Sequence, residues 1–195
     1  MTRKSERLFK RDNLKCNAFY FIDKRKERWF MSKYVNQKQL TYSRRNLLSG
    51  FLFGLGLVAF IDEVVFHQLL NWHHFYDRST TQVGLISDGV FHAFSWFATV
   101  GALFMFADLR RRRAWWGKRW LGGLLFAVGL FNLYDGLIQH KVFRLHQIRY
   151  DVNLLPYDLT WNIFAGIIAI IGGVILYQTQ RVIKNRGEPT YEPSS

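Results

Sequence analysis

Four long apolar stretches, separated by short polar segments, dominate the hydrophobic pattern of this chain. They cover residues 47–70, 83–107, 121–143 and 159–177. A helix needs about 20 apolar residues to cross a bilayer, and these stretches have that length. The connecting segments show no alternation of apolar and polar residues that would indicate strands. The pattern therefore predicts an all-α protein, built as a bundle of four transmembrane helices.

The basic residues are distributed unevenly among the connections. The chain has 27 Lys and Arg against 14 Asp and Glu, which gives a net charge of +13. The basic residues concentrate before the first helix, after the fourth, and between the second and third (Arg110, Arg111, Arg112, Arg113, Lys118 and Arg119). The connections 71–82 and 144–157 carry only three arginines together. By the positive-inside rule, we expect both termini in the cytoplasm and these two connections outside.

The position of the basic residues beside the spans also decides which partner the net positive charge indicates. A run of arginines beside a predicted span is explained better by anionic lipid headgroups than by DNA, so we expect the lipid bilayer, and no nucleic acid, as the partner. The single cysteine, Cys16, excludes a disulfide framework and cysteine-based zinc or redox motifs. The predicted organisation is a basic cytoplasmic tail over residues 1–45, in which Met31 is an alternative start, a membrane domain over 46–178 and a cytoplasmic tail over 179–195.

The two halves of the membrane domain resemble each other. One constant shift along the sequence aligns Asp62 with Asp135, His67 with His140 and His73 with His146. A slightly smaller shift aligns Asp88 with Asp158 and His92 with Asn162. Both halves begin on the same side of the membrane. The alignment therefore predicts a parallel 2+2 internal repeat, related by an axis along the membrane normal.

All six histidines lie at or beyond the predicted outer ends of the helices, together with several carboxylates. Ionisable side chains at this depth are costly unless they find partners inside the protein, and here the partners are one another or a shared cation. The first candidates for metal ligands are His67, His92 and His140, which lie on three different helices. The further candidates are His73, His74, His146 and Asp88, with Asp62, Asp135 and Asp158 as orienting or bridging carboxylates. Imidazole and carboxylate ligands suit iron, copper(II), zinc or manganese.

The spacing of these residues makes some ligand pairs easier than others on an ideal helix. Asp88 and His92 are four residues apart and project from nearly the same face, as do Glu63 and His67. Asp62 and His67 are five residues apart, which is about 140° around an ideal helix. We therefore expect Asp62 and His67 to share an ion only if the helix bends, and otherwise expect Asp62 to orient an imidazole through its other nitrogen.

Four segments carry a resemblance to a known family: FIDEVVFHQLLNWHH (60–74), SDGVFHAFSW (87–96), LFNLYDGLIQH (130–140) and LHQIR (145–149). Over residues 46–178 the chain resembles the bacterial family of predicted membrane proteins of unknown function numbered 2243 (DUF2243). The resemblance implies a multi-pass protein of the bacterial inner membrane and no established activity. Glu63 stands where the family pattern carries Gly, and Gln147 stands where a second histidine after His146 would improve the match between the halves. These two departures weaken an equivalence of two metal sites.

The observations favour an integral inner-membrane protein with a His/carboxylate transition-metal site near its outer face, acting in metal handling or in the assembly of a redox complex. Its further partner would be another membrane protein or a second copy of the chain. Three alternatives stay open. A membrane-embedded di-metal oxidoreductase would use the same kinds of metal ligands as desaturases and hydroxylases, although those enzymes have more histidines, in more closely spaced motifs. A b-type haem protein would use His67 and His140 as axial ligands, and a structural subunit would contain only a metal-free polar network.

Overall fold

The computed structural model describes residues 37–187, and its contacts divide the chain into two units, residues 1–41 and 42–195. All the helices considered below belong to the second unit. The predicted N-terminal tail up to residue 36, with the alternative start at Met31, and residues 188–195 lie outside the described residues.

Four helical segments in the described part are long and apolar enough to cross a membrane, and residues 37–187 contain no strand. The first combines α2 (Ser43–Asp62) with the π-helix η1 (Glu63–Leu69), and the third combines α4 (Gly117–Leu133) with the π-helix η2 (Tyr134–Phe143). The second and fourth are the uninterrupted helices α3 (Thr81–Arg111) and α5 (Leu154–Gly187). The predicted all-α class and the four spans are therefore confirmed.

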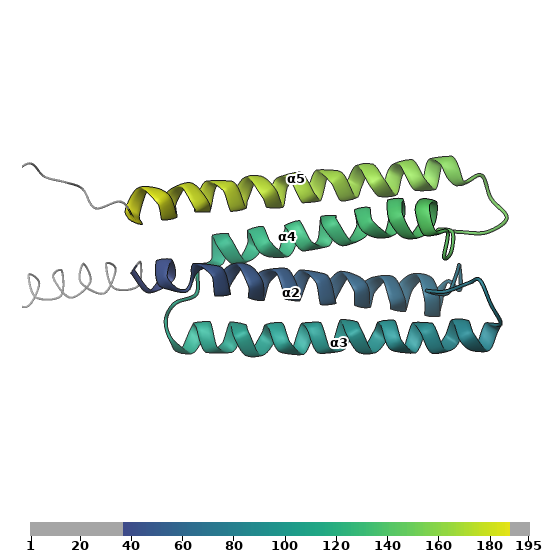
Figure 1. Cartoon of the computed structure of the whole chain (residues 1–195), viewed down its shortest axis with the longest axis horizontal. Coiled ribbons are helices and arrows are strands. Elements are labelled where there is room, and N and C mark those ends of the chain that lie inside the picture. Colours follow the sequence, from purple (N-terminus) through teal and green to yellow (C-terminus); the bar gives the residue numbers. More distant parts are fainter. Residues whose placement is uncertain (1–36, 188–195) are drawn as a thin grey trace, which may run out of the picture. The chain divides into compact units, whose positions relative to one another are not determined.

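The helices lie side by side in the order α3, α2, α4, α5 (Figure 1). Helices α2 and α4 are the central pair and run parallel, while α3 packs on α2 and α5 packs on α4. The outer helices leave much of their apolar surface exposed, including Leu85, Phe97 and Phe104 on α3 and Leu155, Phe164 and Ile170 on α5. Apolar surface of this extent fits contact with the hydrocarbon of a bilayer.

Glycines bring the two central helices into close contact. A Cβ atom on Gly50 of α2 would lie 2.0 Å from the carbonyl oxygen of Trp120 on α4, and one on Gly123 of α4 would lie 2.5 Å from the carbonyl oxygen of Leu47 on α2. Small residues at such positions let the backbones of two membrane helices approach closely. The shift that aligns His67 with His140 also aligns Gly50 with Gly123, so the two contacts fix α2 and α4 in a matched axial register.

Helices α2 and α4 begin, and α3 ends, at one end of the row of helices (Figure 1), and the sequence is rich in Lys and Arg at these helix ends. Arg45 contacts the carboxylate of Asp108 at 3.1 Å. Arg119, which is buried, donates hydrogen bonds to the carbonyl oxygen of Ser43 at 2.9 Å and to the hydroxyl of Thr179 at 3.1 Å. The π-helices η1 and η2 lie at the opposite end, so the parallel central helices carry their histidines to one end of the molecule.

Candidate metal centre

Each π-helix brings together an aspartate and a histidine that are five residues apart. In a π-helix the hydrogen bonds run from residue i to i+5, so each turn is about one residue longer than in an α-helix and residues five apart share a face. The Asp62 carboxylate lies 3.7 Å from His67 Nε2, and the Asp135 carboxylate lies 3.2 Å from His140 Nε2. The ideal-helix angle expected for Asp62 and His67 therefore does not apply, because the helix widens where these residues lie.

Both π-helices end in the same way and lead into loops that carry a second histidine. Asn71 and Arg144 have positive φ angles, 48° and 51°. The amide of Trp72 then bonds back to the carbonyl of Phe66 at 2.9 Å, and the amide of Leu145 bonds back to the carbonyl of Gln139 at 3.0 Å. These turns occupy equivalent positions in the two halves, and they direct the loops back over the ends of α2 and α4.

The two loops exchange hydrogen bonds through His73 and His146. His73 Nδ1 lies 3.0 Å from the carbonyl oxygen of Ile148, and His146 Nδ1 lies 2.9 Å from the carbonyl oxygen of Phe75. A carbonyl oxygen can only accept, so each Nδ1 carries the hydrogen and each Nε2 is left with its lone pair in the neutral imidazole. The two rings stack, with centroids 4.5 Å apart and planes inclined by 4°.

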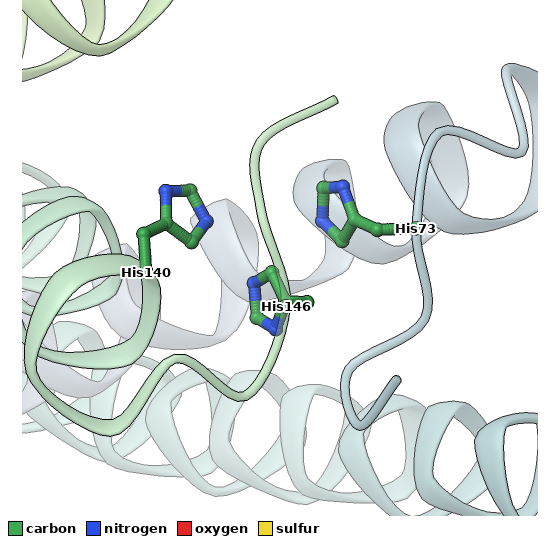
Figure 2. Close-up of side chains that lie close together, drawn as sticks. All are labelled: His73, His140 and His146. Carbon is green, nitrogen blue, oxygen red and sulfur yellow. The ribbon is translucent and has the colours of Figure 1, made fainter. Parts of the chain in front are cut away.

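His67 and His140 complete a group of four imidazoles, three of which Figure 2 shows pointing into one space from η2 and the two loops. The four side chains are nearly inaccessible to solvent: the exposed fractions are 1% for His67, 6% for His73, 1% for His140 and 2% for His146. Yet the Nε2 atom of every one of them is buried without a hydrogen-bond partner in the described part of the chain. Buried polar atoms are normally satisfied, so four such nitrogens in one place, beside buried carboxylates, are the groups that could hold a metal ion.

Burial also determines the charge of His73. Removal from water is the main cause that lowers the pKa of its imidazole well below the usual value, and the neighbouring His146 and His67 lower it further. His73 is therefore neutral across the physiological pH range. A neutral imidazole with a hydrogen-bonded Nδ1 is the form in which histidine binds metals.

Asp88 organises the first half of the cluster from α3. Its carboxylate accepts hydrogen bonds from the Phe75 amide at 2.7 Å, from His67 Nδ1 at 3.1 Å and from His74 Nδ1 at 2.6 Å. Glu63, also buried, lies 2.9 Å from the same His67 nitrogen. Glu63 is not among the ligands predicted from the sequence, although its four-residue spacing from His67 is a usable signal. The carbonyls of Phe75 and Ile148 had no signal in the sequence, because any residue carries a carbonyl.

The structure does not bring His92 or Asp158 into the cluster. The face of α3 that packs on α2 carries Gly84, Asp88, Phe91 and Ser95, all buried. His92 follows Phe91 by about 100° of helix rotation, so it is exposed and contacts the ring of Phe60 at 5.6 Å between centroids. Asp158 forms an ion pair with Lys141. The expectation that Asp88 and His92 act together is thus not met, and Asp88 acts with His67 and His74 instead.

Three overlapping groups of buried side chains have ligand atoms within 4.8 Å of one another. They are Asp62, His67 and His73; His73, His140 and His146; and Glu63, His67 and Asp88. In the third group His67 takes part through Nδ1, which donates its hydrogen to Asp88 and lies 2.9 Å from Glu63, so that group orients His67. The first two groups contain the orphaned Nε2 atoms and share His73. The Asp135 carboxylate also lies 3.2 Å from His140 Nε2 and 3.4 Å from His146 Nε2, so these imidazoles, with Asp62 and Asp135, are the side chains that could hold metal ions.

Residues 49–180 match the model of a family described as predicted membrane protein (DUF2243). The chain belongs to this family. The match covers every histidine and carboxylate of the cluster, and the description of the family agrees with the four apolar spans. No curated protein and no solved structure matches the chain significantly. Membership in the family therefore supports a membrane location, and the description of the family names no chemical activity.

Two further glycine contacts lie at positions that the predicted internal repeat relates to each other, and the repeat itself stays a prediction. Gly56 of α2 packs against the backbone of Ser95 and Thr99 on α3, and Gly129 of α4 packs against the backbone of Ala165 and Ala169 on α5. The two shifts that align the histidines and aspartates also align Gly56 with Gly129, Ser95 with Ala165 and Thr99 with Ala169. Two similar helical hairpins packed side by side would produce this correspondence.

Proposed function

We propose that this protein is a membrane metalloprotein that holds a transition metal at the end of α2 and α4 opposite the basic segments. Its role would lie in metal handling or in the assembly of a redox complex. The observation that carries the proposal is the set of four buried imidazoles whose Nε2 atoms lack hydrogen-bond partners beside two buried carboxylates. Every other feature of the cluster either orients these groups or keeps water away from them.

The electrostatics of the cluster favour a bound cation. His67 Nδ1 faces Glu63 and Asp88, so its hydrogen is on that side and the lone pair of Nε2 faces Asp62 at 3.7 Å. His146 Nε2 likewise faces Asp135 at 3.4 Å. Lone pairs of nitrogen and carboxylate oxygen repel each other unless a proton or a metal ion lies between them. A buried polar atom left without a partner costs about 1–3 kcal/mol, and a metal ion would remove this cost at several atoms together.

Protonation of the histidines, without a metal ion, accounts less well for the orphaned nitrogens. A metal-free network that protonated all four histidines would place imidazolium ions side by side, with the ring centroids of neighbouring histidines only 4.5 to 6.2 Å apart. Positive charges so close together repel strongly in a buried site of low effective dielectric. The haem alternative is also disfavoured, because His73 and His146 lie against both His67 and His140 and fill the space that a porphyrin between an axial pair would need.

The location of the site follows from the distribution of charge. The positive-inside rule places the basic end of the helices in the cytoplasm, which would put the cluster near the outer face of a bacterial inner membrane. A metal site there suits delivery to, or exchange with, a partner on the outer side of the membrane. The exposed faces of α3 and α5 offer room for such a membrane partner or for a second copy of the chain.

Metal analysis of the purified full-length protein tests the proposal. We expect wild-type protein extracted in mild detergent to contain iron, copper, zinc or manganese, or to take up one of them. His146→Ala should lower the metal content at saturation, because it removes an orphaned nitrogen. His92→Ala is the matched control: it removes an exposed imidazole outside the cluster and should leave the metal content unchanged.

Insertion and a monodisperse elution profile would show that His146→Ala still folds. A wild-type protein that contains no metal and takes up none of the four would refute the proposal and leave the polar network. Equal loss of metal in His146→Ala and His92→Ala would also contradict the assignment of the cluster.

A further inference from the structure

We propose that the cluster binds two transition-metal ions, one for each half of the molecule, and that the ion of the first half is held more tightly. Asp62, His67 and His73 would hold the first ion, and Asp135, His140 and His146 would hold the second. This inference rests on the proposed function, because it concerns the number and inequality of the ions in the same site.

The sequence pattern repeats one ligand set twice. In each half an aspartate is followed after five residues by a histidine and after six more by a second histidine. The aspartate and first histidine of each set lie at a π-helix, and the second histidine follows a residue of positive φ in the loop. Each half thus presents two imidazoles and one carboxylate from the same local geometry.

The orientation of the two loop histidines argues against one shared ion. The lone pair of an imidazole nitrogen lies in the plane of the ring, so a metal ion binds close to that plane. The rings of His73 and His146 are stacked, with planes inclined by only 4° and centroids 4.5 Å apart. Because the planes are parallel and separated, an ion near the plane of one ring lies well outside the plane of the other. His73 and His146 are therefore suited to two ions rather than one.

The chemistry of each set indicates the kind of ion. Two histidines and one carboxylate leave several coordination positions open, an arrangement that is typical of non-haem Fe(II) sites. With three protein ligands for each ion, exogenous ligands can occupy the open positions. We therefore take Fe(II) as the probe for both ions.

The two halves differ in how they support their ligands. In the first half Glu63 and Asp88 lie within 3.1 Å of His67 Nδ1. In the second half Gly136 stands at the place of Glu63, Asp158 pairs with Lys141, and His140 Nδ1 has no hydrogen-bond partner among the described residues. Loss of such an outer contact to a ligating histidine typically lowers metal affinity by about 10- to 100-fold. The second ion should therefore bind about 10- to 100-fold more weakly than the first.

Anaerobic titration of metal-free wild-type protein with Fe(II) tests the inference without any variant. We expect saturation at two ions per chain in two steps that differ by about 10- to 100-fold in dissociation constant. Saturation at one ion would overturn the two-ion inference while leaving the proposed metal site intact. Absence of any binding would instead refute the proposed function, so the two failures are distinguishable.

Variants then assign the ions to the halves. His140→Ala should remove the weaker step and retain the tighter one, whereas His67→Ala should remove the tighter step. Asp158→Asn, which changes a carboxylate outside the cluster, should retain both. Loss of both ions in His140→Ala, in a protein that still inserts and elutes as a single species, would show one cooperative site and contradict the separate assignment.

Discussion

Asp88 provides the sharpest test of how the cluster is organised, because it touches no orphaned nitrogen and would act only through its neighbours. Its two oxygens accept from the Phe75 amide, from His67 Nδ1 and from His74 Nδ1, at 2.7, 3.1 and 2.6 Å. In Asp88→Asn the side chain keeps one oxygen and gains an amino group that can only donate. At least one of the three donors then faces another donor, and the negative charge that supports His67 is lost.

The size of the effect follows from these contacts. A hydrogen bond to a charged group contributes about 1.5–3 kcal/mol, and each 1.4 kcal/mol corresponds to about a tenfold change in a binding constant. Loss of one such contact to His67 therefore predicts about a 10- to 100-fold loss of metal affinity, in agreement with the effect of outer contacts at other histidine sites. The backbone of η1 should change little, because Asp88 accepts its hydrogen bonds from two imidazoles and from the Phe75 amide, which lies outside η1.

A competition titration against a chromophoric chelator in detergent measures this affinity. Asp158→Asn is the matched control, since Asp158 aligns with Asp88 in the repeat but pairs with Lys141 outside the cluster. We expect the control to change the affinity by less than about threefold, well below the effect of losing an outer contact. An unchanged affinity in Asp88→Asn, or an equal loss in the two variants, would refute the assignment of Asp88 as the support of His67.

Two further predictions concern the fold and its orientation. Gly50→Ala should lower the thermal stability in detergent, because its Cβ would lie 2.0 Å from the Trp120 carbonyl oxygen and overpacking typically costs about 1–3 kcal/mol. The control Gly101→Ala should leave the thermal stability unchanged, because nothing lies within 4 Å of the added atom. An equal loss of stability in both variants would contradict the close packing of α2 and α4. A cysteine at Arg78 on a cysteine-free background should react with an impermeant thiol reagent in intact cells, and a cysteine at Lys118 should not; the reverse result would overturn the predicted orientation.

The sequence by itself determined the class of the protein. Four apolar stretches of membrane-spanning length, with arginines and lysines concentrated in alternate connections, are properties of composition along the chain and need no knowledge of packing. The alignment of Asp62, His67 and His73 with their counterparts in the second half also belongs to the sequence. It identified most of the buried cluster because ionisable residues in apolar helices are costly and therefore rare.

The tertiary structure decided which of these residues meet. An ideal helix separates Asp62 from His67, and only the π-helix, which depends on how the helix end packs, brings them together. Helical spacing pairs Asp88 with His92, but the packing of α3 on α2 buries one and exposes the other. The carbonyls of Phe75 and Ile148, which set the hydrogen position on two histidines, are backbone groups that every residue has. Spacing along one helix fixes only local neighbours, whereas a site assembled from four segments depends on the contacts between them.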